Sequence, residues 1–272
     1  MRFPRKAAVQ LLADSPWGKC LQSNLEARKP QIQAEWSRSA EEQARARAES
    51  RWYGPERPKF LGPLEADYPP WLRGDAPADY GFDPLALSRE PAAFERNFEL
   101  EILHARWAML GALGALVPEA LQYTGVTSFA EPRWWAVGAA KLNGEDLNYL
   151  GVSGLRIAGG QGILIIAFCQ VLLMFGPEYA RACGSGALEP LGIALPDKNY
   201  PGTVWFDPLN LAGEARAFER LRVQELKHGR LAMVAWLGFT AQALVTCKGP
   251  LQNAIDFVQD PAHNNVAALL GA

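Results

Sequence analysis

Cysteine is scarce in this sequence and follows no pattern that would build a site. The four cysteines, Cys20, Cys169, Cys183 and Cys247, lie far apart among 272 residues, and none belongs to a Cys-x-x-Cys pair. Zinc sites and disulfide frameworks need cysteines at close, regular spacing. We therefore expect neither kind of site.

Strong net charge and strand-like alternation are also missing. The formal net charge is −2 and the mean hydropathy is −0.09, so the average composition indicates neither a soluble nor a membrane protein, and we expect no nucleic-acid partner. The repeated segments described below lack alternating or β-branched runs and are rich in Ala, Leu, Met, Glu and Arg, which favour helices. The sequence therefore predicts an all-α fold.

Three apolar stretches, each about as long as a helix that crosses a ~30 Å hydrocarbon core, stand out against this average. They cover residues 107–123, 157–176 and 231–246. We therefore predict an all-α membrane protein with three transmembrane helices and short amphipathic surface helices. The predicted transmembrane helices are approximately residues 97–123, 156–181 and 217–247.

The first 51 residues differ from the rest. They hold ten Lys or Arg against six Asp or Glu, and no apolar run follows that would make them a secretory signal. We predict that 1–51 is a basic surface segment with a solvated helix within 31–50, ahead of a membrane domain that spans 52–272. Pro and Gly crowd residues 52–83, which should lie extended along a surface. The amphipathic stretch 251–258 should lie flat on the membrane.

Residues 82–114 and 206–238 are two copies of one segment. The second copy begins 124 residues after the first, and 17 of the 33 positions are identical. One predicted helix lies between the copies, so both cross the membrane in the same sense, as a parallel repeat with a pseudo-two-fold axis along the membrane normal. Basic residues crowd the N-terminal side and the second loop, which places the N-terminus on the side from which the chain inserts.

Both copies contain the pattern Glu-x-x-His-x-Arg. Within one helix the Glu and the Arg lie ~140° apart around the axis, so they cannot pair well. Pairing between the copies would neutralise charges that otherwise cost about 2.5–3.5 kcal/mol each inside a bilayer. The predicted pairs are Glu101 with Arg230 and Glu225 with Arg106.

Small residues recur at every third position of both helices. Such ridges let two helices cross with their backbones nearly touching and leave a groove on either side. We therefore predict that the first and third transmembrane helices cross. The small residues are Ala105, Ala108, Gly111 and Gly114 in the first copy, and Gly229, Ala232, Ala235, Gly238 and Ala241 in the second.

Two of the three histidines, His104 and His228, occupy equivalent places in the repeat. Each lies on the same helix face as the preceding Glu. Neutralised carboxylates and imidazoles suit a Mg²⁺ ion that a macrocycle already holds and that needs one axial ligand. The alternative is a di-iron carboxylate oxidase, which also uses Glu-x-x-His helices. That site needs carboxylates from two further helices, and the nearby arginines would repel its metal, so we expect no enzyme.

Two motifs resemble the first and third transmembrane helices of light-harvesting chlorophyll a/b-binding proteins. They are Glu-Leu-Glu-Ile-Leu-His-Ala-Arg-Trp-Ala-Met-Leu-Gly and Gln-Glu-Leu-Lys-His-Gly-Arg-Leu-Ala-Met-Val, and the resemblance runs from Trp52 to Asn265. It implies an antenna of the chloroplast thylakoid membrane with a stromal N-terminus. Such a protein holds chlorophylls a and b. It also holds carotenoids, which are lutein or other xanthophylls, and these lie in the two grooves beside the crossed helices. It passes excitation energy to a photosystem core among neighbouring antenna proteins and thylakoid lipids, and it has a photoprotective role.

The resemblance also implies roles for individual residues. The expected magnesium ligands are Glu101, His104, Glu178, Glu225, His228 and Gln242. The expected ion-pair partners are Arg106 and Arg230, together with Arg181 beside Glu178. Gln161 and Gln170 are expected to contact chlorophyll b, the backbone carbonyl of Phe60 to bind a further chlorophyll b, and Lys227 to hold a phospholipid.

Other positions bear on the type of antenna. Phe257 stands where many family members have a chlorophyll-binding His, so this site is expected to be empty or differently ligated. Trp52, Tyr53 and Arg57 resemble a trimerisation motif, whereas two loops resemble a minor, monomeric antenna of photosystem II. The tail after Asp260 resembles antennae of photosystem I. We predict a photosystem II antenna, with a photosystem I antenna as the alternative.

Overall fold

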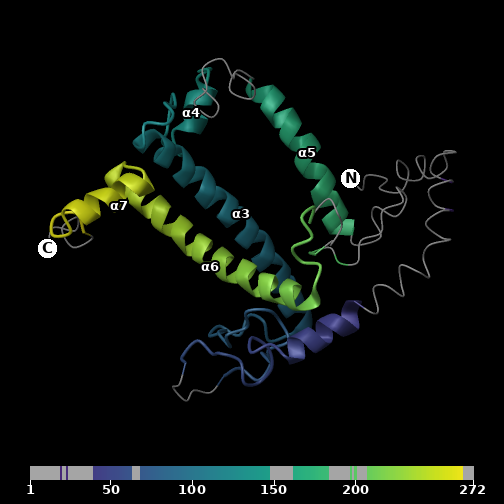
Figure 1. The fold of residues 1–272 in the computed structure, drawn as a ribbon. Coiled ribbons are helices and arrows are strands. Elements are labelled where there is room, and N and C mark those ends of the chain that lie inside the picture. The colour runs from purple at the N-terminus through teal and green to yellow at the C-terminus, as the bar shows by residue number, and fades with distance from the viewer. Residues whose placement is uncertain are drawn as a thin grey trace. The chain divides into compact units, whose positions relative to one another are not determined.

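The computed structural model describes residues 19, 23, 39–62, 68–147, 162–183, 197, 199–200 and 207–265. Its labelled helices are α3 (Pro91–Tyr123), α4 (Val137–Leu142), α5 (Ile163–Cys183), α6 (Ala215–Thr246) and α7 (Pro250–Gln259) (Figure 1). No strand occurs within these described ranges, so the all-α prediction is confirmed there. Gln161, most of the segment 1–51 and the start of the second predicted transmembrane helix lie outside them.

The long helices differ in how well they suit a membrane. In the described part of the chain, α3 is the one helix that is by itself long enough and apolar enough to cross a bilayer. Helix α6 meets the same test only when it is taken together with α7, and the two are bent by 74° relative to each other. The apolar part of α5, Ile163–Glu178, is shorter. Three transmembrane helices therefore remain a prediction.

The chain forms two compact units. One combines Met1–Leu100 with Leu173–Leu226, and the other combines Glu101–Leu172 with Lys227–Ala272. Helices α3, α5 and α6 each contribute residues to both units. The boundary predicted between residues 51 and 52 stays a prediction.

The repeat extends to the conformation of the loops that open it. Asp83 and Asp207 each accept hydrogen bonds from the backbone N–H groups four and five residues later, at 2.9–3.0 Å. Within these loops the equivalent residues Ala86 and Asn210 both have a left-handed backbone, with φ of 53° and 51°. An Asp side chain that takes up backbone donors stabilises such a turn. Both copies therefore enter their helices in the same way.

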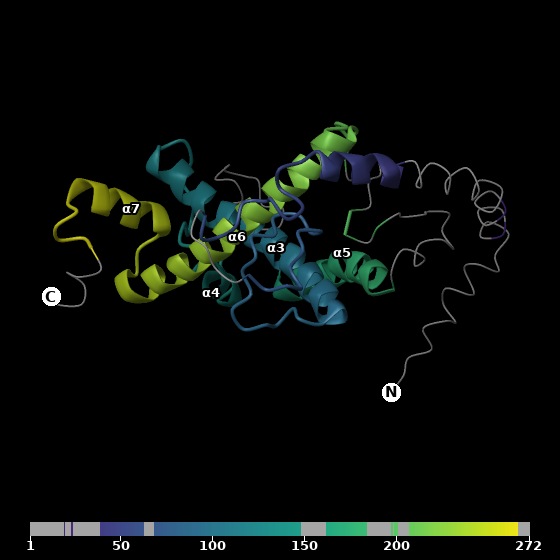
Figure 2. The same ribbon diagram turned by 90° about the horizontal axis from the view of Figure 1, so that it is seen from below.

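Helices α3 and α6 run alongside each other in Figure 1, cross in Figure 2, and touch within the second unit. A Cβ atom on Gly229 would overlap the side chain of Ala105 and lie 3.0 Å from its Cα atom. Further along, the indole of Trp236 covers Gly111, and its Nε1–H donates to the carbonyl oxygen of Ala108 at 3.1 Å. The predicted close approach of small residues is confirmed at these positions.

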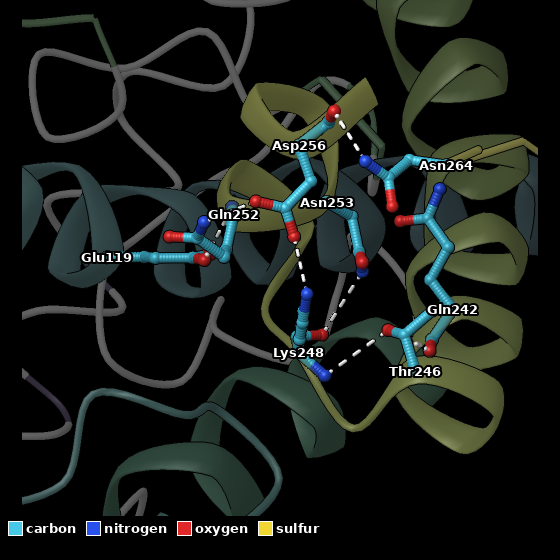
Figure 3. Close-up of polar contacts among 8 residues, drawn as sticks. All are labelled: Glu119, Gln242, Thr246, Lys248, Gln252, Asn253, Asp256 and Asn264. Atoms are coloured by element: carbon cyan, nitrogen blue, oxygen red, sulfur yellow. Dashed lines mark hydrogen bonds and ion pairs between the residues drawn. The ribbon is translucent and has the colours of Figure 1, made fainter. Parts of the chain in front are cut away.

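Helix α7 is held to α3 by one carboxylate. Glu119 accepts hydrogen bonds from the backbone N–H groups of Leu251, at 3.0 Å, and Gln252, at 2.9 Å. These N–H groups have no acceptor within α7 itself, because they lie in its first turn. The N-terminal end of a helix is its positive end, where an anion is favoured. Figure 3 shows Glu119 beside this first turn. The predicted short helix near 251–258 is thus present, and its position on a membrane stays a prediction.

Candidate functional site

The candidate site begins with an ion pair between the two copies of the repeat. Arg230 Nε donates to Glu101 Oε1 at 2.6 Å, and the side chains are 38% and 29% exposed. This pair joins α6 to α3, as predicted, and neutralises two charges on apolar helices. It engages one oxygen of the carboxylate, and the other oxygen keeps lone pairs that a metal ion can share. The second pair, Glu225 with Arg106, stays a prediction.

Both candidate histidines lie on outward faces of their helices. His104 and His228 are exposed, and the residue three positions after each is a large exposed apolar side chain, Trp107 at 52% and Leu231 at 68%. Residues three apart share a helix face. Each imidazole therefore stands beside an apolar surface, an arrangement that suits a large apolar ligand with a metal at its centre.

The apolar surface of these helices is extensive. Exposing it to water would cost roughly 25 cal/mol per Å², and contiguous patches of this kind mark membrane or ligand contacts. It therefore fits a covering of lipid or of macrocyclic and polyene ligands. Examples more than 60% exposed are Leu110 and Leu113 on α3, Leu164, Phe168, Val171, Leu172, Leu173 and Phe175 on α5, and Val234, Leu237 and Leu244 on α6.

Helix α5 carries a second Glu–Arg arrangement. Arg181 Nη1 lies 3.6 Å from Glu178 Oε1, and the Glu178 side chain is half exposed. Gln170, two turns earlier, is also exposed. The neighbouring Arg offsets the carboxylate charge, so Glu178 has the same character as Glu101. It can offer an oxygen to a metal ion without leaving an unbalanced negative charge.

Gln242 and Lys227 lie on α6, 15 residues apart. The Gln242 side chain is exposed, and its backbone oxygen accepts a hydrogen bond from the Thr246 hydroxyl at 2.8 Å (Figure 3). An exposed amide has an oxygen suited to Mg²⁺. Lys227 is half-buried, and an ammonium there suits an anionic headgroup.

Phe60 lies in the Pro- and Gly-rich segment and is fixed by its backbone and its ring. Its N–H donates to the carbonyl oxygen of Tyr80 at 3.0 Å. Its ring packs edge-on against Phe82, with centroids 5.1 Å apart, and against Tyr68 at 5.8 Å. A backbone carbonyl held in this way could serve as a ligand whatever the side chain is.

Two residues of the predicted trimerisation motif are buried within the chain. Tyr53 is 8% exposed and Arg57 is 5% exposed. Arg57 also pairs with the Asp79 carboxylate at 2.9 Å and donates to three backbone carbonyls at 2.7–3.1 Å. It therefore connects two stretches of the extended segment. The carbonyls are those of Gly54, Leu72 and Asp79. Trp52, the third motif residue, is half-buried.

The sequence did not indicate three structural residues, Trp236, Glu119 and Glu219. Trp236 fills the helix contact, yet its counterpart in the first copy is Ala112, so repetition gave no hint. Glu119 caps a helix that begins more than 130 residues later. Glu219 could have been suspected, because it is shared by both copies and has no part in the Glu-x-x-His-x-Arg pattern.

Comparison with known proteins places this architecture in a family. The family model described as Chlorophyll A-B binding protein matches residues 68–244. Chlorophyll a-b binding protein 7, chloroplastic, from Solanum lycopersicum is 34% identical over 207 residues, which cover 74% of this chain and 71% of that protein. Chlorophyll a-b binding protein 6, chloroplastic, from Arabidopsis thaliana is 37% identical over 203 residues, covering 74% and 76%. Photosystem I chlorophyll a/b-binding protein 5, chloroplastic, from Arabidopsis thaliana is 34% identical over 204 residues, covering 74% and 77%.

Proposed function

Because this chain belongs to the chlorophyll a/b-binding protein family, we propose that it is a light-harvesting antenna of the chloroplast. One observation carries the proposal. The Glu101–Arg230 pair lies at a close helix contact, while His104 and His228 stand outward beside exposed apolar side chains. Bound chlorophyll supplies absorption of visible light and transfer of the excitation energy. The protein fixes each pigment's position and orientation and carries out no catalytic turnover.

We assign one axial magnesium ligand to each pigment held by a side chain. Mg²⁺ is a hard cation that takes oxygen ligands readily, and the arginines keep the carboxylates neutral overall inside the apolar layer. The proposed ligands are Glu101, His104, Glu178, Glu225, His228 and Gln242, with Arg106, Arg230 and Arg181 as the neutralising partners. Phe257, which is half exposed, holds no pigment through its side chain.

The finer parts of the proposal concern further cofactors and topology. Carotenoids lie in the grooves beside the α3–α6 contact, where they give photoprotection, and Lys227 holds a phospholipid. Gln161, Gln170 and the Phe60 carbonyl contact chlorophyll b. The chain crosses the thylakoid membrane three times with its N-terminus in the stroma. The apolar faces of α3, α5 and α6 support this topology.

The energy acceptor is proposed to be a photosystem core, reached with neighbouring antenna proteins among thylakoid lipids. Sequence motifs favour a photosystem II antenna, and the relative named for photosystem I supports the alternative. We propose a monomer rather than a trimer through Trp52, Tyr53 and Arg57. Two of these three residues are already buried within the chain.

An absorption spectrum tests the proposed function. Protein purified in mild detergent is expected to show the red and blue chlorophyll bands, and extraction is expected to yield chlorophylls a and b together with xanthophylls. Each ligand side chain accounts for one pigment in this scheme. A colourless preparation that contains iron would contradict the antenna function and favour the oxidase.

The change His104→Ala is expected to remove about one chlorophyll per chain. The methyl side chain offers no axial ligand, while the Glu101–Arg230 pair one turn earlier remains to hold the helices together. Pigment extraction and the difference spectrum measure the loss. The matched control is His263→Ala, because His263 is exposed, lies outside the repeat and pairs with Asp260. Equal pigment content in the two variants would contradict the role of His104.

A further inference from the structure

Glu219, in the first turns of α6, is a buried carboxylate with three hydrogen-bond donors around it. Its side chain is 2% exposed. It accepts hydrogen bonds from Arg47 Nε at 2.8 Å, from the Tyr53 hydroxyl, and from Arg222 at 3.2 Å. A buried charge is tolerated only when such partners surround it. The Glu219 carboxylate is therefore held in place by hydrogen bonds within the first unit.

Two of those donors belong to a segment far away in sequence. Residues 39–62, here called the N-terminal strap, contain a helix at 39–48 that lies beside the first turns of α6 (Figure 1). A second pair, Glu49 with Arg216 at 2.6 Å, joins the same two elements at the surface. Burial, and next the hydrogen bond to Glu219, raise the pKa of Tyr53 well above its ordinary value. The hydroxyl thus remains a donor at physiological pH.

The anchor at Tyr53 continues along the strap to Phe60. The N–H of Gly54 donates to the carbonyl oxygen of Gly74 at 3.1 Å. Arg57 then binds the strap to residues 72–79 through the carbonyl oxygens of Leu72 and Asp79 and the carboxylate of Asp79. The N–H of Phe60 makes the last link, to Tyr80. The strap is thus held at Tyr53 by Glu219, and at Gly54, Arg57 and Phe60 by hydrogen bonds and an ion pair to residues 72–80.

The equivalent glutamate in the first copy of the repeat has different surroundings from Glu219. The counterpart of Glu219 in the first copy is Glu95, which is exposed on α3. The counterpart of Arg222 is Phe98, which cannot pair with a carboxylate. The shared Glu is therefore buried and surrounded by donors only where the strap covers it.

We propose that Glu219 is a positioning residue for the pigment at the Phe60 carbonyl. It touches no pigment itself. It fixes the N-terminal strap on α6 and so sets where that carbonyl points. This inference rests on the proposed function and adds a residue that the ligand pattern does not contain.

The test compares Glu219→Gln with Glu95→Gln in the full-length pigmented protein. The first change removes the charge that Arg47 and Tyr53 share, and hydrogen bonds to charged groups are strong enough that trypsin cleavage after Arg51 is expected to rise about tenfold. About one chlorophyll per chain, of the b type, is expected to be lost while the others stay. Glu95→Gln is expected to change neither readout.

A second variant keeps the proposal testable if Glu219→Gln fails to fold. Arg47→Ala removes one donor from the strap side, where the side chain is partly exposed, and it is expected to give the same two effects in smaller measure. Faster cleavage with the full chlorophyll complement in both variants would overturn the positioning role. The same holds if every pigment is lost in equal proportion. A wild-type preparation without chlorophyll would instead contradict the proposed function.

Discussion

Gly229→Val is expected to prevent assembly of the pigmented protein. Any Cβ atom at this position would overlap Ala105, so α3 and α6 would have to move apart. Separation would weaken the Glu101–Arg230 pair and the bond from Trp236 to the Ala108 carbonyl, which both span the same contact. Overpacking alone costs about 1–3 kcal/mol, and the lost contacts add to that cost. Pigment yield on reconstitution and the thermal unfolding midpoint measure the effect.

A matched pair of alanine variants isolates the steric cause. Gly229→Ala and Gly238→Ala make the same chemical change on the same helix, and both raise helix propensity by roughly 1 kcal/mol. Among the residues that the structure describes, no atom outside the neighbouring residues and backbone of α6 lies within 4 Å of a Cβ placed on Gly238. Gly238→Ala should therefore be neutral or stabilising, whereas Gly229→Ala should destabilise. Equal behaviour of the two variants would show that the close helix contact does not hold the fold together.

Arg230→Leu is expected to be nearly as damaging, for an electrostatic reason. The change leaves the Glu101 carboxylate without its 2.6 Å partner on an apolar helix. An unpaired charge within a bilayer costs about 2.5–3.5 kcal/mol, and the partial exposure of both side chains places the effect near the lower end. Loss of chlorophyll and a lower unfolding temperature in mild detergent report the destabilisation.

The double variant Glu101→Gln with Arg230→Leu is the internal control. It leaves no charge to neutralise, and the amide oxygen of Gln can still bind Mg²⁺, so it should recover much of the stability and pigment lost in the single variant. Arg220→Leu, at an exposed position earlier on α6, should have little effect. If the double variant were no better than Arg230→Leu, packing of the arginine stem rather than charge pairing would explain the loss.

The features that repeat could be predicted from the sequence. Two copies with the same Glu and Arg leave cross-pairing as the simplest way to neutralise charges that lie on different faces of one helix. The Glu101–Arg230 pair confirms that argument, and the contact of Gly229 with Ala105 confirms the argument from small residues. Both predictions depend on local spacing, which one sequence displays directly.

The features that break the repeat could not be predicted in this way. Trp236 opposes Gly111, but its counterpart Ala112 gave no reason to expect an indole at the contact. Glu219 and Glu95 are identical in sequence, and only the covering strap makes one of them buried. Such contacts join residues more than a hundred positions apart, and their geometry depends on the whole fold rather than on any periodic pattern.

The bond between Glu119 and α7 has a consequence for the order of biosynthesis. Its two donors lie 132 and 133 residues later in the chain, and translation at ~5–20 residues per second delays them by roughly 7 to 27 seconds. During that interval Glu119 lacks the backbone donors that it later caps, so this link between α3 and α7 forms only after α6 and the start of α7 have been made. A ribosome that stops before Pro250 would therefore release a chain in which Glu119 has no α7 N-terminus to cap.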